Sequence, residues 1–422
     1  MKASLPALFL LLLVAAPAGA QPLVESGSTG ALGPLAPSFD TTIPLPEDGV
    51  LHYTTVDIPV GVTVTFVRNA DNTPVYLLAS DDVVIRGTID VSGKAGTATA
   101  GLGGVTHLGG VGGPGGSDGG SVNGTVAQFG LGPGGGGANN GGDTAGNGGA
   151  SPIENGDRGV NALATHASTV IGEAYGDPGY VPLHGGSGGG GGYKSGAYAG
   201  SGGGGAIVIA SSGTITIDGA VRANGGPDST RGGLGGGGFI RLVAAEVSGA
   251  GVLEARGNVG EVCGTNFRGG CGGDGLIRVE AYDLTGALSE NAAPGLFYTL
   301  PQAAVPYPPA ERPRLTIKRA NGKVPFYGAY FGHALQSPGV SLPADVTFTV
   351  ELEARYVPTG YVAQVMMNAV GQERTVVMST PLAGTFELST ATAEVTIPAG
   401  AKLGVLEAWL PNVPLPLPVT PP

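Results

Sequence analysis

The sequence predicts an all-β protein in which a parallel β-helix (a β-solenoid) carries a large glycine-rich insertion and precedes a small β-sandwich. Three observations support this fold class. Short hydrophobic runs of period two recur in the same order along the chain, glycine is concentrated between these runs, and the C-terminal part alternates apolar with polar residues. Period two places successive side chains on opposite faces of a strand, and such short strands bury a continuous core only when copies stack.

Residues 1–20 are expected to be a signal peptide that is removed on export. A single Lys precedes an apolar run from Leu5 to Ala16, and the segment ends in Ala18-Gly19-Ala20, a small-x-small cleavage site. The run breaks at Pro17 and is too short to span a bilayer, so a membrane anchor is the weaker interpretation. We therefore expect a secreted protein, extracellular or at the cell surface, with no membrane span.

The solenoid prediction depends mainly on two segments that align without a gap. Residues 75–93 read VYLLASDDVVIRGTIDVSG, and residues 207–225 read IVIASSGTITIDGAVRANG. A third copy at 239–257 needs a one-residue adjustment, and a fourth at 276–288 is shorter. Each copy contains three short strands, which predicts one coil of a solenoid per copy.

The expected corners of the coils are glycines at matching positions of the copies. Gly87, Gly219 and Gly251 stand between strands, where positive φ or close backbone approach is needed. The predicted organisation of the exported chain is then as follows: an N-terminal segment and first coils over 21–96, the glycine-rich insertion over 97–204, further coils over 205–291, a Pro-rich linker over 292–312, the sandwich over 313–410 and a Pro-rich tail over 411–422.

This pattern resembles the right-handed parallel β-helix proteins of the pectin-lyase-like and adhesin-passenger group, in their glycine-rich exported form. The segment IPVGVTVTF (58–66) is similar to the opening coil of many such helices. The resemblance covers about residues 45–290 and concerns the fold, so it implies either a surface protein or a polysaccharide-active enzyme.

The insertion has two interpretations, a flexible linker or a set of packed extended glycine helices. Glycine-rich tip domains of some bacteriophage adhesins resemble it, and the lack of a strict G-X-Y period excludes collagen. The insertion also contains the candidate ligand-binding residues. They are candidates because tyrosines on a surface of small residues suit carbohydrate or protein contact. These candidates, for which packing within the insertion is the alternative role, are Tyr175, Tyr180, His184, Tyr193 and Tyr198.

The C-terminal part predicts an Ig-like or fibronectin-like sandwich. VTFTVELEA (346–354) alternates apolar with polar residues, and several further alternating runs follow at short spacing. Trp409, the only tryptophan, is expected to fill the core or an edge rather than to form a ligand platform.

The two cysteines, Cys263 and Cys271, are expected to form a disulfide in an exported chain. By the loop-entropy estimate the link would contribute roughly 2.5 kcal/mol. A metal site is the alternative, but no His or further Cys lies nearby in the sequence to complete a tetrahedral set.

No set of residues in the sequence indicates a particular chemical reaction. A glycosidase requires two carboxylates flanking the bond, and the only adjacent pair is Asp81-Asp82 at a corner. Calcium binding by Asp118, Asp143 or Asp157 is less favoured than a role as solvated loop carboxylates. Charged residues on outward strand positions are expected to be solvated. They are Arg86, Asp90, Asp218, Arg222 and Arg241.

The predicted function is a non-enzymatic surface or extracellular-matrix protein, adhesive or structural, that binds through the glycine-rich insertion. The alternative is a polysaccharide-active β-helix enzyme, a lyase or glycoside hydrolase. We expect no catalytic residues, metal or cofactor. The expected partner is a cell-surface or matrix polysaccharide or protein, with self-association as a further possibility. The net charge of −12 argues against nucleic acid.

Overall fold

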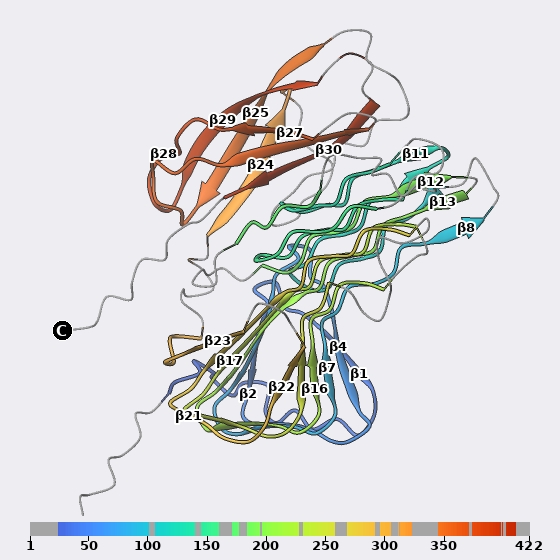
Figure 1. Ribbon diagram of the computed structural model, residues 1–422. Coiled ribbons are helices and arrows are strands. Elements are labelled where there is room, and N and C mark those ends of the chain that lie inside the picture. The colour runs from blue at the N-terminus through green and yellow to red at the C-terminus, as the bar shows by residue number, and fades with distance from the viewer. Residues whose placement is uncertain are drawn as a thin grey trace, which may run out of the picture.

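The computed structural model describes most of the chain as β-strands and extended segments (Figure 1). The described residues are 24–100, 106–139, 145–159, 171–176, 184–194, 196–227, 231–257, 268–291, 296–304, 311, 313–322, 345–370, 374–397, 399 and 402–410. Within these ranges there is no α-helix, and the all-β class is confirmed.

Three sheets with parallel pairing are formed by strands that follow one another in rotation along the chain. The first sheet contains β1 (Thr41–Pro44), β4 (Thr63–Val67), β7 (Thr88–Asp90), β16 (Ala220–Arg222), β19 (Val252–Glu254) and β22 (Ser289–Asn291). The second contains β2 (Val50–Tyr53), β5 (Val75–Ala79), β14 (Ala206–Ser211), β17 (Phe239–Val243), β20 (Leu276–Glu280) and β23 (Leu296–Thr299). The third contains β3 (Val56–Ile58), β6 (Val83–Ile85), β15 (Thr214–Ile217), β18 (Glu246–Ser248) and β21 (Asp283–Leu284).

The gapless alignment of the first two copies is reproduced as strand register. Ile207 lies beside Val75, Ile215 beside Val83 and Val221 beside Ile89, one pair in each sheet. The predicted parallel pairing of these copies is therefore confirmed. Gly219 also lies at a corner as expected, between β15 and β16. A Cβ at this position would overlap the carbonyl oxygen of Gly87, so the close approach of the two backbones requires glycine.

The three sheets enclose one hydrophobic core made of their inward residues. Ile58, Leu77, Ile89, Ile209 and Ile217 are all fully buried in it. In the third sheet, β3, β6, β15 and β18 alternate buried with more exposed residues, as in Thr214–Ile217. The second sheet differs, because every residue of β5, β14, β17 and β20 is buried. Its outer face forms a second cluster with Val24, Ala304 and Ile153.

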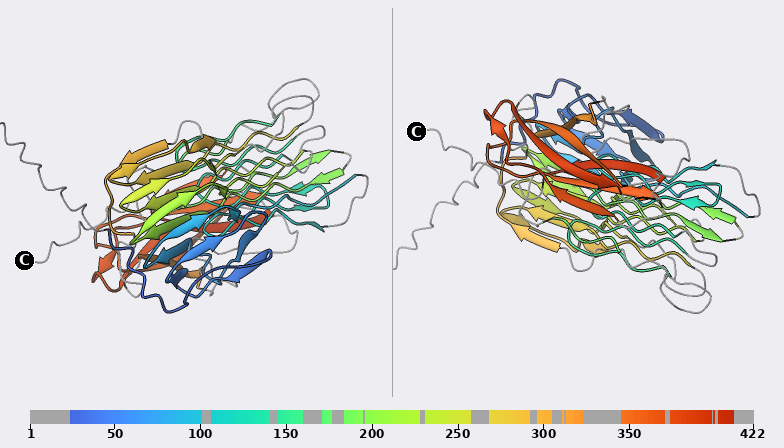
Figure 2. Two further views of the ribbon diagram at one scale, coloured as in Figure 1. Left: turned by 90° about the horizontal axis from the view of Figure 1, so that it is seen from below. Right: turned by 90° about the horizontal axis from the view of Figure 1, so that it is seen from above.

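The glycine-rich segments form a bundle of extended chains that continues beyond the three sheets (Figures 1 and 2). We call it the glycine bundle, and its described segments are 91–97, 108–121, 127–139, 145–159, 171–176, 184–191, 199–205, 223–227, 231–238, 255–257 and 268–275. It therefore combines described parts of the predicted insertion with the segments that follow β7, β16 and β19.

Backbone hydrogen bonds in the glycine bundle repeat every three residues. The six amides of residues 200–205 donate in turn to three neighbouring segments, and residues three apart reach the same neighbour. The amides of Gly200 and Gly203 donate to the carbonyl oxygens of Gly120 and Ser117, respectively. Those of Ser201 and Gly204 donate to Gly233 and Gly236, and those of Gly202 and Gly205 donate to Lys94 and Val91. All six bonds are 2.8–2.9 Å long. Three residues per turn without internal hydrogen bonds is the geometry of a polyproline II helix. Of the two interpretations of the insertion, the described segments fit packed extended helices.

Two small antiparallel sheets stand at the far end of the glycine bundle (Figure 1). One contains β9 (Thr106–His107), β10 (Val122–Asn123) and β11 (Val126–Ala127), and the other contains β8 (Ala98–Ala100), β13 (Gly196–Tyr198) and β12 (Gly192–Lys194). We call this end the tip.

The described residues between 313 and 410 form two antiparallel sheets that share one hydrophobic core, here called the C-terminal sheet pair. One sheet contains β24 (Arg314–Ala320), β25 (Val346–Arg355), β29 (Ser389–Ile397) and β28 (Ala383–Gly384). The other contains β27 (Thr375–Met378), β26 (Gln364–Val370) and β30 (Lys402–Trp409). The alternation noted in β25 is observed, since Phe348, Val350 and Leu352 are buried. The sheet pair lies along the glycine bundle (Figure 1).

Candidate functional site

Two of the five candidate ligand-binding residues lie in the contact between the glycine bundle and the C-terminal sheet pair. The ring of Trp409, on β30, lies 5.7 Å from that of Tyr175 in an edge-on arrangement and 4.3 Å from that of His184. The Tyr175 hydroxyl donates a hydrogen bond to the carbonyl oxygen of Gly185. Trp409 is buried by this contact, at 5% exposure. Trp409 thus fills the junction between two parts of the molecule, and Tyr175 and His184 are not a free binding surface.

Polar groups of the sheet pair hold the backbone of the same part of the glycine bundle. Buried Glu407 accepts a hydrogen bond from the Gly132 amide at 2.9 Å. The guanidinium of Arg374 donates to the carbonyl oxygens of Pro133 and Gly135, at 3.0 and 2.8 Å, and lies 5.9 Å from the centre of the Phe129 ring. The contact therefore combines aromatic packing with charge-assisted hydrogen bonds to a backbone that presents few side chains.

Burial in this contact shifts the pKa values of both ring residues. His184 and Tyr175 each keep part of their surface exposed, and the ring of Trp409 packs against both of their rings. Burial lowers the pKa of His184 to about 3, and it raises the pKa of Tyr175, with a hydrogen bond to Ser187 acting in the opposite direction. His184 is therefore neutral at pH 7.

The other candidate tyrosines are divided between the tip and residues that the structure does not describe. Tyr193 on β12 is partly exposed and packs against the small cluster of Val122, Ala127 and Ala197. Tyr198 on β13 is buried, and the guanidinium carbon of Arg231 lies 5.1 Å from the centre of its ring. Tyr180 lies outside the described residues.

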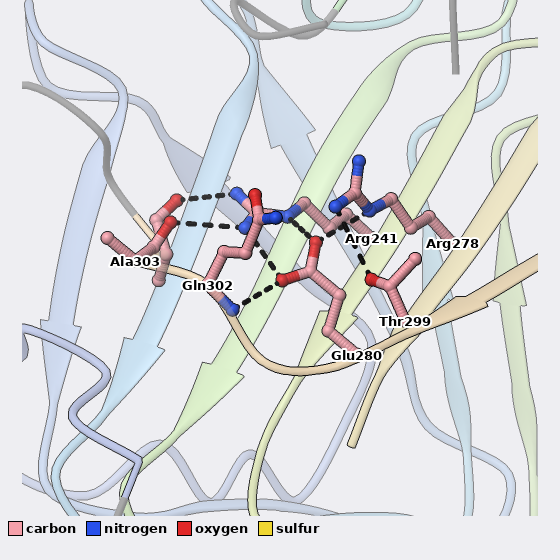
Figure 3. Close-up of polar contacts among 7 residues, drawn as sticks. Arg241, Arg278, Glu280, Thr299, Gln302 and Ala303 are labelled. Atoms are coloured by element: carbon pink, nitrogen blue, oxygen red, sulfur yellow. Dashed lines mark hydrogen bonds and ion pairs between the residues drawn. The ribbon is translucent and has the colours of Figure 1, made fainter. Parts of the chain in front are cut away.

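A buried ion cluster on the outer face of the second sheet was not anticipated from the sequence (Figure 3). Arg241 of β17 binds Glu280 of β20 through two hydrogen bonds, from Nε at 2.7 Å and from Nη2 at 3.0 Å. Arg278 Nε lies 2.8 Å from the same carboxylate. Exposures are 2% for the Arg241 side chain, 0% for Glu280 and 7% for Arg278. The expectation that Arg241 is solvated is wrong, because both faces of this sheet are covered.

The cluster fastens the chain that leads from the parallel sheets toward the C-terminal sheet pair. Arg241 donates to the carbonyl oxygens of Ala303 and Ala304, both at 3.1 Å, and Glu280 accepts from the Gln302 amide at 2.8 Å (Figure 3). The sequence did contain a signal. The runs FIRLV and LIRVE place an arginine in the middle of two mainly apolar strands, and these two residues, Arg241 and Arg278, lie side by side in the parallel pairing of β17 with β20.

The adjacent carboxylates at residues 81 and 82 act as turn acceptors. Asp82 accepts hydrogen bonds from the amide and the hydroxyl of Thr214, at 2.8 and 3.0 Å, and Asp81 accepts from the Asp82 amide. This links a corner of one copy to the corner of the next. Glycosidase chemistry needs a free carboxylate pair across a substrate cleft, which these partners do not favour.

The other charged candidates have local partners. Arg86 pairs with Asp57, Arg222 with Glu254 at 2.9 Å, and Asp118 with Arg68 at 2.7 Å. Asp118 also accepts from the Gly112 amide, so it closes a turn in the glycine bundle. Asp143 lies outside the described residues. Among those that are described, no group of three or more His, Cys, Asp or Glu residues is arranged to hold a metal ion.

The expected disulfide stays a prediction because Cys263 lies outside the described residues. Cys271 lies in the glycine bundle, where its carbonyl oxygen accepts a hydrogen bond from the Asp157 amide. We expect both cysteines to be oxidised when the protein is produced in an oxidising compartment. Mass spectrometry of a non-reduced digest should show a linked species two hydrogens lighter than the thiol form, whereas alkylation of both thiols without reduction would contradict the link.

Comparisons with protein-family models, curated proteins and solved structures gave no match to this chain. No helix in the described part of the chain is long and apolar enough to cross a membrane.

Proposed function

We propose that the chain is an exported, non-enzymatic surface or matrix protein with an adhesive or structural role. In this proposal the three parallel sheets are a parallel β-helix, the C-terminal sheet pair is an Ig-like sandwich, and residues 1–20 are the export signal. The rotation of the strands through three parallel sheets and the register between copies support the first assignment. Two antiparallel sheets around one core support the second.

The observation that carries the functional proposal is the backbone hydrogen bonding of the glycine bundle. Each third residue of a segment bonds to the same neighbour, so a segment such as 200–205 is held on three sides. A body held in this way has little freedom to close around a small substrate. It is instead a stiff support that presents whatever side chains stand on its outer surface.

The contact surface that we propose is at and beside the tip. Leu108 and Val111 are three residues apart in one extended segment, so both face outward, with 64% and 47% of their surface exposed. Partly exposed Tyr193 lies in the tip itself. Leu108 follows β9 and Tyr193 lies on β12, both at the tip, and Val111 lies farther along the same segment beside Lys94, whereas Tyr175 and His184 are covered by Trp409. Weak contacts to a repeating polymer or a cell surface suit such a site.

The test is a pull-down of the purified protein on insoluble matrix polysaccharides and on cells. We expect a variant with Leu108→Ser, Val111→Ser and Tyr193→Ser to lose at least about tenfold in retention, because apolar and aromatic contact area is removed while the cores of the parallel sheets and of the C-terminal sheet pair are unchanged. Leu32→Ser is the matched control, since Leu32 is 54% exposed and belongs to the N-terminal segment beside β2.

Equal retention of the triple variant and the parent protein would contradict the tip assignment. Release of new sugar ends from the polysaccharide by the parent protein would instead favour the enzyme alternative. Deletion of residues 97–204 is not a clean test, because segment 200–205 also bonds to residues 233 and 236 outside the insertion.

A further inference from the structure

We propose that the hairpin turn at Asn123 and Gly124, in the tip, is a site of spontaneous modification, at which the asparagine loses its side-chain amide and becomes aspartate or isoaspartate. In the glycine bundle, backbone hydrogen bonds protect asparagines of the same local sequence from this reaction. The inference does not depend on the proposed function, because the modification is measured on the protein itself.

The reaction is favoured where glycine follows asparagine, because glycine has no side chain to keep its backbone nitrogen away from the asparagine side chain. The glycine nitrogen attacks the asparagine Cγ, the new N–Cγ bond closes a succinimide ring, and the Cγ–Nδ2 bond breaks. Ammonia leaves with the amide proton. Water then opens the ring at either carbonyl, which gives aspartate or isoaspartate. A hydrogen bond that holds the glycine amide against a neighbouring segment opposes the first step.

The sequence contains six asparagines that are followed by glycine. They are Asn123, Asn140, Asn147, Asn155, Asn224 and Asn321. All of them except Asn140 lie among the described residues, with the glycines that follow them. The hydrogen bonding of these glycines divides the five pairs into two groups.

The first group contains the three pairs of the glycine bundle, in which each glycine amide donates to a neighbouring carbonyl oxygen. The bonds run from Gly148 to Asp157 at 2.8 Å, from Gly156 to Gly172 at 2.9 Å and from Gly225 to Arg256 at 2.7 Å. The asparagine side chains are held as well, because each Oδ1 accepts a hydrogen bond from a backbone amide. Asn147 accepts from Gly159, Asn155 from Ala174 and Asn224 from Arg256.

Burial alone does not define this group. Asn147 and Asn224 are buried, but Asn155 is exposed. Attack at any of the three asparagines first requires a local opening that breaks bonds between segments. We therefore expect exposed Asn155 to be protected like its two buried counterparts.

The second group contains the two pairs that stand in turns. Gly124 lies between β10 and β11 with a φ of 60°, and Gly322 follows β24 with a φ of 71°. Among the described residues, no acceptor binds the amide of either glycine. Asn123 and Asn321 are both exposed. The attacking nitrogen in these turns is therefore not fixed by a neighbouring segment.

Conversion of Asn123 would alter the structure of the tip. Asn123 pairs with Val126 of β11 and with Thr106 of β9, and the adjacent Val122 belongs to the cluster on which Tyr193 packs. Either product adds a negative charge, and isoaspartate also lengthens the backbone within the strand. If the tip is the contact surface, as proposed above, binding should decline as the protein ages.

Peptide mapping of the full chain tests the proposal. The protein is incubated in mildly alkaline buffer, folded or in concentrated urea, and mass spectrometry follows the loss of the amide at each asparagine. In the folded protein we expect Asn123 to convert at least about tenfold faster than Asn147, Asn155 and Asn224, since these three react only through local opening. In urea all four should convert at similar rates.

Gly124→Asn is the matched variant, because Asn tolerates the left-handed conformation of this turn. The new side chain crowds the attacking nitrogen, so conversion of Asn123 should slow by at least about tenfold. Asn321 of the same molecules is the internal control, and its rate should not change.

Equal conversion of Asn123 and the three bundle asparagines in the folded protein would overturn the proposal. Slow conversion of those three in urea would also overturn it, because their protection would then come from the local sequence rather than from the glycine bundle. So would an unchanged rate at Asn123 in the Gly124→Asn variant, since the amide of residue 124 would then not be the attacking group.

Discussion

Replacement of Gly203 by Ala is expected to disrupt the glycine bundle and to lower the free energy of unfolding by about 3 kcal/mol or more. A Cβ at this position would overlap the carbonyl oxygen of Gly186 in the neighbouring segment. The Gly203 amide also donates to Ser117 and the Gly186 amide to Gly204, so neither segment can move away without loss of hydrogen bonds. Backbone atoms cannot turn aside as the end of a flexible side chain can, and the segments must separate.

Urea unfolding followed by circular dichroism measures this effect, with Gly124→Asn as the control. Gly124 stands in the hairpin turn between β10 and β11 with a φ of 60°, and nothing lies within 4 Å of a Cβ built there. Asn tolerates the left-handed conformation, so the control should change stability by less than about 1 kcal/mol. Equal stability of the Gly203→Ala variant and the parent would show that the segments are not packed as described.

The second large effect is expected from Glu280→Gln, which should destabilise the protein by about 3–5 kcal/mol. Glu280 is the carboxylate between Arg241 and Arg278, and the substitution leaves two guanidinium groups facing each other in a buried site. It also weakens the acceptor for the Gln302 amide, which helps to hold the chain leading to the sheet pair. Gln is close in volume to Glu, so the loss measures charge rather than packing.

Glu254→Gln is the matched control for this variant. Glu254 pairs with Arg222 at 2.9 Å in the first sheet, but 45% of the Arg222 side chain is exposed. Exposed pairs typically contribute less than about 1 kcal/mol. Thermal unfolding of both variants at pH 7 tests the contrast. A Glu280 variant no less stable than the Glu254 variant would mean that the buried cluster does not fasten the fold.

The parts of the fold that follow a local repeat could be predicted from the sequence. The alignment of Val75 with Ile207 depends only on alternation and spacing, and the same alternation sets the strand register in the structure. For the glycine segments, the sequence allows ordered packing as one interpretation but does not distinguish it from a flexible chain. Glycine-rich sequence fits a flexible chain equally well, and the decision depends on which distant segments supply the hydrogen-bond partners.

The candidate site was predicted less well, for a physical reason. The sequence indicates Tyr175 and His184 as ligand-binding candidates because they are aromatic residues among small residues. In the structure, the C-terminal sheet pair covers the surface on which they lie. The sequence gives no direct indication that Trp409, more than two hundred residues later, packs on them. The cluster of Arg241, Arg278 and Glu280 does not follow from the sequence pattern alone, because alternation along a strand is typical of a sheet with one solvated face. The unbroken apolar runs of β5 and β14 indicate a sheet covered on both sides.

The hydrogen bonding of the glycine bundle also constrains the order in which the chain can fold. The amides of Val91 and Gly93 bond to the carbonyl oxygens of Arg222 and Asn224, and the Asn224 amide returns to the Ser92 hydroxyl across 132 residues of sequence. A chain that emerges from its N-terminus can pair β1 to β7 early, but segment 91–97 must wait for most of its partners. Such distant pairing slows folding and prolongs the exposure of unpaired backbone. Nascent chains that stop before residue 222 should therefore remain open, protease-sensitive intermediates rather than shorter versions of the mature fold.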